Sequence, residues 1–475
     1  MSNTSFGLVV TSSGLEVWCI ECNGIKYLKA DTLIDNAATL DKELQTVLKD
    51  SSYLESFSRA DVYGVYVPDM LKKVLVCGIT KEGSVKVGEK LAKSLFLSPD
   101  KVYFEGNFQE VVGDYLCDVV VVSGGFNDSS NDKVGALIAD IAESEWFKKN
   151  RPKVIYAGNK KSVSEAQVRF SPFTDFYEID NILEEGLAKG LFTEYEKLDL
   201  CSKIPFKLKN SSVEKVKFSS YQSCILKLSD FMCWAYSPRV VTILLNDNYS
   251  TVNQCRFDTG KTVNTSISVS KNSKDLDLDI FSKAYSEFLM RDQPVSNDFF
   301  FEDDILPLAE KQSKKLYRPE RIVGVSLSQD VDMKRFINLI SDPDTVRGVV
   351  EFYFDNSGFF LICGSILGSE TPIREEKIEE MLKSYQVSSG WLIIPDGDFN
   401  RNKTALEVYT VGGNQKNVFR ILWGKRYTIP VRENSVVELR FKGSAYIKGR
   451  NTVVILKSGK TPKNLVVDVR KGKSL

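Results

Sequence analysis

Residues 6–21 read FGLVVTSSGLEVWCIE, and this stretch decides the fold. Two apolar runs flank the small-residue turn Thr11–Gly14, which is the pattern of a β-hairpin. The same design returns at residues 240–257, VVTILLNDNYSTVNQCRF, where the polar turn Asn246–Ser250 separates two further strand-like runs. A hairpin that recurs so far along one chain indicates two related halves.

The segment between the two hairpins alternates strand-like and helix-like patterns. Val74–Cys77, Asp118–Val122 and Val154–Ala157 are short apolar runs of the kind found in buried parallel strands. Helical patterns alternate with them, the clearest carrying Val134, Leu137, Ile138, Ile141 and Ala142 on one face. Alternation of this kind predicts βαβ units in a Rossmann-like or flavodoxin-like insert over 73–185, which we expect to pack on the N-terminal lobe.

The second half is predicted in less detail. Helices are expected over 181–200, 275–290, 302–318 and 373–385, and strands at Phe359–Cys363 and Trp391–Ile394, with a Gly/Ser loop at Gly364–Ser369. From residue 423 the pattern becomes short β-segments separated by turn residues. The expected domains are therefore 1–72, 73–185, 186–422 and a small β-domain over 423–475.

Composition excludes several classes of function. The chain has 475 residues, with 63 Lys+Arg against 63 Asp+Glu, which disfavours a generic nucleic-acid binder. It contains 0 histidines, so Ser-His-Asp catalysis, HExxH zinc sites and His-ligated haem are impossible. Any acid–base chemistry must use Asp, Glu, Lys, Tyr or Cys.

The N-terminus shows no signal-peptide pattern, and no apolar run approaches the ~20 residues of a membrane-spanning helix. The 9 cysteines are irregularly spaced, and Cys19-Ile-Glu-Cys22 has no second pair that would complete a zinc ribbon. We expect a cytoplasmic protein with reduced thiols, no metal site, no transmembrane segment and an unidentified protein partner.

Two hairpins and a late glycine loop suggest a nucleotide clamp of the actin or hexokinase type, in which backbone N–H groups hold the phosphates. Four stretches then resemble the MutL/GlmL family found beside glutamate mutase, which is unrelated to the mismatch-repair protein: Val74–Ile79 (VLVCGI), Val119–Asp128 (VVVVSGGFND), Ile155–Lys160 (IYAGNK) and Val466–Lys473 (VVDVRKGK). The resemblance implies a two-lobed actin-like ATPase fold, with a Rossmann-like inserted domain and a small C-terminal β-domain. It also implies an ATP-dependent chaperone or reactivase of a cobalamin-dependent mutase.

The chain departs from that family where phosphate chemistry would occur. In the first hairpin, this chain has Val9 where the family's D-x-G-S-T turn begins with Asp. Glu16 stands where the family has a Lys after the turn. The second turn has Leu245 in place of Asp, with Asp247 and Asn248 in place of two glycines. The third loop, Cys363-Gly364-Ser365-Ile366, keeps one glycine of three. These changes predict a protein that does not hydrolyse ATP and has no catalytic residues.

Two sets of binding residues are expected. Ser12, Ser13, Gly364 and Ser365 are the candidate nucleotide contacts, and Ser12, Asp247 and Gly364 should line one crevice. Gly124, Gly125, Asn127, Asp128, Gly158 and Asn159 follow two strands of the insert, where open α/β sheets bind ligands. The alternatives are an ordinary hairpin turn at 11–14, and helix caps with tight turns in the insert.

The sequence thus favours a pseudo-ATPase of actin-like fold that acts as a binding or scaffold component. The alternatives are the mutase reactivase and a small-molecule-binding protein that uses the insert. No cofactor is expected under the first interpretation, whereas the reactivase would need ATP and Mg²⁺.

Overall fold

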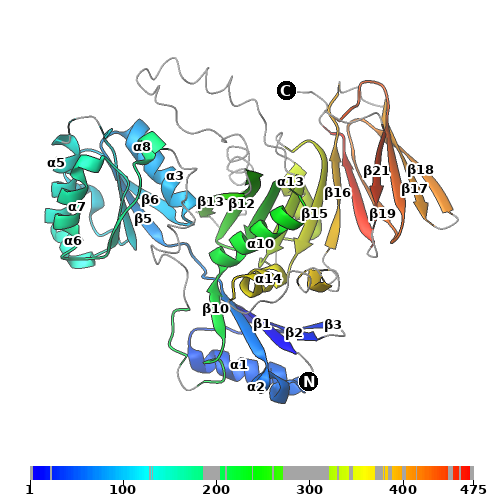
Figure 1. Ribbon diagram of the computed structural model, residues 1–475, viewed down its shortest axis with the longest axis horizontal. Coiled ribbons are helices and arrows are strands. Elements are labelled where there is room, and N and C mark those ends of the chain that lie inside the picture. The colour runs from blue at the N-terminus through cyan, green and yellow to red at the C-terminus, as the bar shows by residue number, and fades with distance from the viewer. Residues whose placement is uncertain are drawn as a thin grey trace.

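The computed structural model describes residues 4–470 except for 22–23, 128–129, 131, 186–203, 209–210, 238, 259–260, 271–319, 329–330, 342–345, 370–377, 379, 383–387, 398–402, 413–414, 448–452 and 459–461. The architecture is mixed α/β, with several sheets and with helices packed between and around them (Figure 1).

The first sheet has the strand order β10-β4-β1-β2-β3. Its strands are β1 (Ser5–Thr11), β2 (Gly14–Glu21), β3 (Gly24–Ala30), β4 (Asp61–Tyr66) and β10 (Lys217–Ser220). β1, β2 and β3 form an antiparallel meander, while β4 and β10 run parallel to β1. Because strand side chains alternate, Leu8 and Val10 pack with helices α1 (Ala37–Asp50) and α2 (Leu54–Arg59), whereas Val9 belongs to the core on the opposite face.

The second sheet repeats this connectivity. Its strand order is β13-β12-β11-β14-β15-β16-β22-β19. The strands are β11 (Arg239–Leu245), β12 (Tyr249–Asp258), β13 (Lys261–Ser270), β14 (Arg321–Ser326), β15 (Gly348–Asp355), β16 (Ser388–Ile394), β22 (Lys463–Asp468) and β19 (Arg426–Val431). β11 to β13 form a meander, β14 runs parallel to β11, and β15 runs parallel to β14. The two hairpins expected from the sequence are confirmed, and they open the two sheets in the same way.

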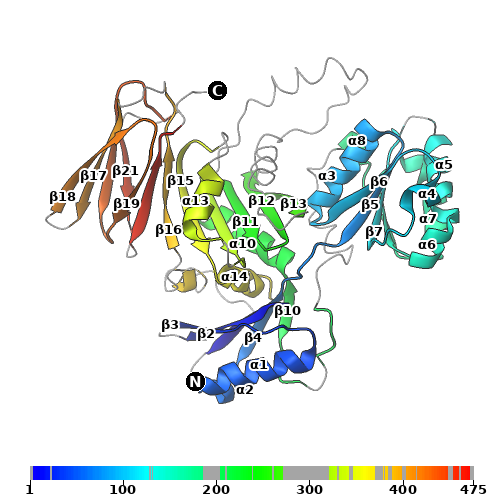
Figure 2. The same cartoon turned by 180° about the vertical axis from the view of Figure 1, so that it is seen from behind.

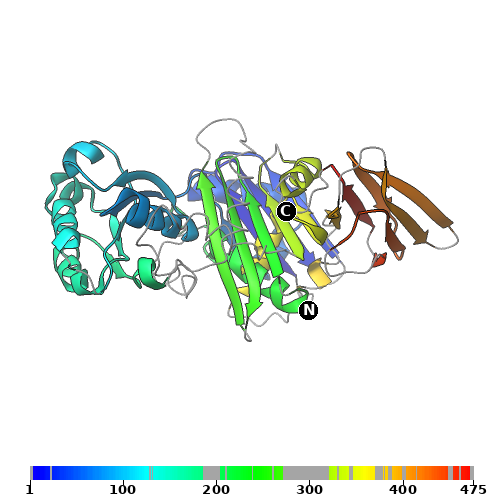
Figure 3. The same ribbon diagram turned by 90° about the horizontal axis from the view of Figure 1, so that it is seen from above.

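Two helices lie between these sheets (Figure 1). α14 (Phe359–Leu367) packs on β1 and β4 of the first sheet, and α10 (Tyr221–Ala235) packs on β11 and β12 of the second. The helices also contact each other. α13 (Met333–Ser341) packs on the second sheet through the core that holds Phe336. Seen from above, the second sheet lies over the first (Figure 3).

Residues 73–185 form a parallel sheet of order β6-β5-β7-β8-β9, an arrangement of the flavodoxin type. Its strands are β5 (Lys73–Gly78), β6 (Ser98–Tyr103), β7 (Val119–Ser123), β8 (Lys153–Tyr156) and β9 (Phe176–Glu178). Its α-helices are α3 (Lys86–Ser94), α4 (Phe108–Val112), α5 (Asp132–Glu143), α6 (Glu145–Asn150), α7 (Val163–Phe170) and α8 (Ile182–Glu185), with short turns at Lys81–Val85 and Lys160–Ser162. The βαβ pattern predicted here is confirmed.

The insert docks on the second sheet, so the expectation that it packs on the N-terminal lobe is wrong. α3 lies against the edge strand β13, and Ser270 Oγ donates a hydrogen bond to Ser98 Oγ at 2.6 Å. Val87 and Leu91 of α3 share one core with Tyr249 of β12. An edge strand presents unpaired backbone groups, and a helix laid along it protects that edge.

The C-terminal β-segments are divided between two sheets. β17 (Thr404–Gly412), β18 (Gln415–Leu422), β20 (Val436–Phe441) and β21 (Val453–Lys457) form a separate sheet of order β18-β17-β20-β21. β19 and β22 instead extend the second sheet. This differs from the β-domain expected to begin at residue 423, because Trp391 and Ile393 of β16 share a core with Leu439 of β20. From behind, this sheet and the insert lie at opposite ends of the molecule (Figure 2).

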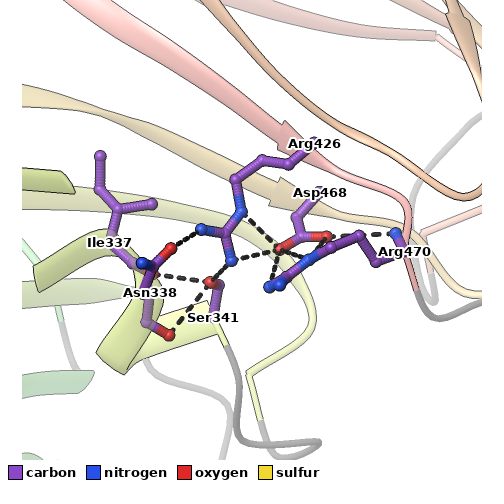
Figure 4. A network of polar contacts seen from close by, with 6 residues as sticks. All are labelled: Ile337, Asn338, Ser341, Arg426, Asp468 and Arg470. Atoms are coloured by element: carbon purple, nitrogen blue, oxygen red, sulfur yellow. Dashed lines mark hydrogen bonds and ion pairs between the residues drawn. The ribbon is translucent and has the colours of Figure 1, made fainter. Parts of the chain in front are cut away.

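A polar network joins α13 to the C-terminal strands (Figure 4). Arg426 Nε donates to Asp468 Oδ2 at 2.8 Å, and the same guanidinium contacts Asn338 and Ser341 of α13. Arg470 NH2 donates to Asp468 Oδ2 at 2.7 Å. Burial raises the pKa of Asp468, but Arg470 and Arg426 outweigh that effect and hold it below its usual value.

One element was predicted with the wrong type. Phe359–Cys363 is not a strand but the first part of α14. Every side chain from Phe359 to Ile366 is buried, so the segment lacks the polar positions that reveal a helical period. The expected helices at 275–290 and 302–318, and most of those at 181–200 and 373–385, lie outside the described residues. Among the described residues, no helix has the length and apolarity needed to cross a membrane.

Candidate functional site

The two hairpin turns lie on either side of the segment that follows β4. Ser12 Oγ in the first turn donates a hydrogen bond to the Asp69 carboxylate. Asn246 Nδ2 in the second turn donates to the Pro68 carbonyl at 3.5 Å. Asp247 is exposed in the same turn. The structure therefore brings together the first two of the three loops expected from the sequence.

A third loop, centred on Gly358, follows β15 and packs close to strands of both sheets. Gly358 has a φ of 76°, a conformation that L side chains rarely adopt. A Cβ at this position would stand 3.3 Å from Val9 Cγ2 and 3.1 Å from Leu327 Cδ2. Leu327 N in turn donates to the Leu245 carbonyl at 2.9 Å. This glycine loop thus reaches strand ends of both sheets.

Gly364 and Ser365, the predicted third loop, lie elsewhere. Both are buried inside α14, so the expected loop at Gly364–Ser369 is wrong over its first part. A Cβ on Gly364 would stand 2.1 Å from the Cys224 carbonyl oxygen, so this glycine allows α14 to touch α10. Ser365 Oγ donates to Ser219 Oγ at 3.0 Å. Gly364 thus packs against helix α10, and Ser365 bonds strand β10 of the first sheet.

Asp355 closes the N-terminal end of α14. Its side chain is buried, and Oδ1 accepts hydrogen bonds from Ser357 N at 2.9 Å and Ser357 Oγ at 2.6 Å. Its other oxygen accepts from Phe360 N at 2.8 Å. A helix N-terminus attracts anions through its free N–H groups and its dipole. At α14 the chain's own carboxylate already fills that role.

Glu16 is the second carboxyl group near this loop. It lies on β2 opposite Val9, and its Oε2 atom is buried with no hydrogen-bond partner among the described residues. Burial, then the charge of Asp355, raises the pKa of Glu16 to about 8, while Lys29 and Tyr27 oppose that rise. Glu16 is therefore largely protonated at neutral pH, and its carboxyl group can donate a hydrogen bond.

At the two strand ends the hairpins present apolar side chains in place of metal-binding ones. Val9 and Leu245, which replace the family's aspartates, are fully or almost fully buried. Ser13 is exposed, and Thr11 Oγ1 lies 3.2 Å from its Oγ, as in an ordinary hairpin turn. Within the part of the chain that the structure describes, no group of three or more Cys, Asp or Glu residues could hold a metal ion.

In the insert, the loops after β7 and β8 lie side by side. Asn159 N donates to the Gly124 carbonyl at 3.0 Å, and a Cβ on Gly158 would stand 2.8 Å from the same oxygen. The expectation that Gly124 and Gly158 meet at one end of the sheet is confirmed. Parallel strands joined by crossovers end on the same side, which is the physical reason.

The polar side chains of these loops bind one another. Asn159 Nδ2 donates to the Phe126 carbonyl at 2.7 Å, and Asn127 Oδ1 accepts from Lys160 N at 2.8 Å. Asn181, which the sequence reading missed, donates to the Gly125 carbonyl at 2.9 Å. This is the pattern of the structural alternative, in which the amides close loops. Asp128 lies outside the described residues, and a ligand role for the whole set stays a prediction.

The sequence did contain a signal for the loop that was missed. The strand-like run Val349–Phe354 (VVEFYF) is followed directly by Asp355-Asn356-Ser357-Gly358. Asp, Asn, Ser and Gly after a strand are typical of a turn that begins a helix. The signal was overlooked because the next residues, FFLIC, resemble a strand in composition.

Comparison with known proteins gives distant structural likenesses only. No protein-family model matches the chain, and no curated protein matches it. A nucleotide-free acetone carboxylase, from work on ATP-dependent acetone carboxylation, is 9% identical with a TM-score of 0.27, over 57% of this chain and 48% of that one. The chain thus spans about half the length of acetone carboxylase.

Two other solved structures cover more of the chain. An ATP-dependent caprolactamase from Pseudomonas jessenii is 10% identical with a TM-score of 0.28, over 88% of this chain and 81% of that one. A Bacteroides thetaiotaomicron protein of actin-like ATPase fold and unknown function is 8% identical with a TM-score of 0.21, over 78% and 96%. With scores this low, no activity is carried over to this chain, and membership of the MutL/GlmL family stays a prediction.

Proposed function

We propose that this chain is a two-lobed actin-like ATPase-fold protein that has lost ATP hydrolysis and serves as a binding or scaffold component. The repeated strand order of the two sheets supports the fold assignment, since each sheet opens with a hairpin and continues with two parallel strands. The crossing of α10 and α14 between the sheets supports it as well. The parallel insert and the C-terminal sheet are additions to that core.

One observation carries the loss of activity: the Asp355 carboxylate occupies the N-terminal end of α14. Its two oxygens accept three hydrogen bonds from Ser357 and Phe360, so few lone pairs remain for a metal ion. Burial raises the pKa of Asp355 despite these hydrogen bonds. A triphosphate brought to the same helix end would find N–H groups that are already bonded to this carboxyl group.

Three neighbouring residues, Val9, Leu245 and Glu16, also support the proposed loss of ATP hydrolysis. Phosphoryl transfer depends on positioned metal ions and on a group that orients the attacking water. Val9 and Leu245 are apolar and buried at the two strand positions where the family places aspartate, so they can do neither. Glu16 adds a second carboxyl group beside Asp355 where the family has a lysine.

Steady-state phosphate release with Mg²⁺ and ATP tests the proposal. We expect no release above the no-enzyme control, because neither a metal site nor a water-orienting group is present in the proposed site. A turnover near the low end of typical enzymes, ~1 s⁻¹, would contradict it if Asp355→Asn abolished that turnover and the exposed-site variant Glu105→Gln did not. The same result would revive the alternative of an ATP-dependent reactivase of a mutase, which requires hydrolysis.

A further inference from the structure

Helix α10 and strand β12 carry two cysteines that face each other. Cys233 lies in the last turn of α10, Cys255 lies in β12, and both side chains are buried. Neither forms a disulfide, and the two residues belong to one core in which α10 packs directly on β12. A disulfide bond would require the two sulfur atoms to approach to ~2.05 Å.

A carboxylate stands beside this pair. Asp230 lies one helical turn before Cys233, so both face the same side of α10. Cys255 Sγ donates to Asp230 Oδ1 at 3.7 Å, and Asn264 Nδ2 of β13 fixes the same oxygen at 2.7 Å. The Cys255 thiol thus lies between a sulfur atom and an oxygen atom, and either can accept its proton.

We propose that Cys233 and Cys255 form a site of reversible oxidation, at which a hydroperoxide converts the two thiols into a disulfide. The Cys233 thiolate attacks one oxygen of hydrogen peroxide, the O–O bond breaks, and hydroxide leaves with a proton as water. Cys255 sulfur then attacks the resulting sulfenic acid, and the S–O bond breaks as the S–S bond forms. The Cys255 proton passes through Asp230 to the departing hydroxide, so two thiols and one peroxide give one disulfide and two waters.

The order of the two thiols follows from their surroundings. The hydrogen bond from Cys255 lowers the pKa of the Cys233 thiol and outweighs the effect of burial. Attack on the peroxide needs thiolate, so Cys233 attacks first and Cys255 second.

The disulfide would join α10 to the second sheet. α10 also contacts α14, which packs on the first sheet. Oxidation would therefore hold one member of the helix pair fixed on β12. This site does not depend on nucleotide binding, and it holds whether or not the chain hydrolyses ATP.

Non-reducing tryptic mass spectrometry of the full chain tests the proposal. Trypsin releases the two cysteines in separate peptides, residues 228–239 and 240–256, and neither peptide contains another cysteine. After treatment of the reduced protein with hydrogen peroxide, we expect these peptides linked, about 2 Da lighter than their sum, and separated again by dithiothreitol. Circular dichroism before and after treatment confirms that the protein stays folded.

Two variants sharpen the test. Cys233→Ser must abolish the linked peptide, whereas Cys224→Ser, which changes a cysteine of the same helix beside Gly364, must leave it intact. The proposal is overturned if folded protein keeps residues 233 and 255 unlinked while Cys117, which is only partly buried, becomes oxidised. It is equally overturned if peroxide links Cys77 to Cys117, which also lie near each other, in place of the proposed pair.

Discussion

Glu16 is a carboxyl group held protonated inside the fold, and this makes stability depend on pH. Burial raises the pKa of Glu16 in the folded chain to about 8. At pH values between the pKa of Glu16 in the unfolded chain and this raised pKa, the folded chain holds a proton that the unfolded chain has released. The free energy of unfolding must therefore fall as pH rises through this window, by on the order of 3 kcal/mol. Glu16→Gln should remove that fall and leave the protein more stable at pH 8 than the wild type.

Chemical denaturation at pH 5 and pH 8 checks this. The matched control is Glu105→Gln, at an exposed position of the insert, which should keep the wild-type difference between the two pH values. If Glu16→Gln shows the same pH dependence as the wild type, Glu16 is ionised in the folded state and the assignment is wrong.

Because Gly364 has no Cβ, helix α14 can pack at close distance against helix α10. Helix propensity alone would make alanine better than glycine by about 1 kcal/mol inside a helix. At this position, however, the new Cβ would stand 2.1 Å from the Cys224 carbonyl oxygen, and backbone cannot move aside cheaply. We expect Gly364→Ala to lower the free energy of unfolding by about 3 kcal/mol, the upper range for overpacking.

The control for that variant lies at the end of the same helix. Gly368 has a φ of −84°, and the nearest atom to a Cβ there would be 3.5 Å away. Gly368→Ala should therefore change stability by less than about 0.5 kcal/mol. Urea titration of both variants gives the comparison, and equal losses would show that the helix crossing is not the cause.

At the scale of elements, the sequence predicts best where one side chain pattern repeats. Both hairpins and the parallel strands of the insert follow from short apolar runs ended by turn residues, because these strands are buried on both faces. Helix α5 follows from the period of 3.6 residues on its buried face. α14 was mistaken for a strand because it is buried on all sides and so has no period. The Asp355–Gly358 turn was therefore not recognised. The third loop was predicted at Gly364–Ser369, whereas the structure has a loop before α14, at Asp355–Gly358.

Partnerships between side chains were beyond sequence reasoning for a different reason. Asn127 and Asn159 were found because they follow strands, but Asn181 lies far along the chain and meets them only through the fold. Glu16 was noted as a departure from the family pattern. Its proton could not be inferred, since the raised pKa depends on burial and on a charge at residue 355.

The joint between α13 and the C-terminal strands rests on Asp468. Its side chain is 5% exposed and is held by Arg426 and Arg470. Asp468→Asn would leave two guanidinium groups without their counter-charge, and we expect a loss of about 3 kcal/mol at pH 7. The pKa of Asp468 is lower in the folded chain than in the unfolded chain, where it is near 3.9. The stabilising contribution of Asp468 is therefore fully present above pH 3.9 and is lost as the pH falls through the folded-state pKa.

Denaturation at pH 7 and pH 3 measures the effect. The difference between Asp468→Asn and the wild type should be large at pH 7 and should shrink at pH 3. Glu433→Gln, at an exposed turn of the same region, should differ from the wild type at neither pH. A loss of equal size at both values would mean that side-chain packing, and not charge, secures the joint.

At the scale of the whole molecule, the repeated strand order is the feature from which the rest of the account follows. Two sheets of one connectivity bring their hairpin turns to the same segment, Pro68–Asp69. The insert packs on the edge strand β13, and at the other end of the second sheet β22 and β19 extend it from β16. Neither attachment could be predicted, because the choice of a strand's neighbour depends on contacts far apart in the chain.

Isothermal titration calorimetry with MgATP tests the central claim most directly. The account predicts a dissociation constant weaker than ~1 mM, which is about −4 kcal/mol, because under the proposed function the Asp355 carboxyl group already occupies the N-terminal end of α14 and buried Val9 and Leu245 supply no metal ligand. Micromolar binding at the hairpin turns would contradict the account. That result requires that Ser12→Asp, in the first hairpin turn, abolishes the binding signal, and that Ser56→Asp, on the exposed surface of α2, preserves it.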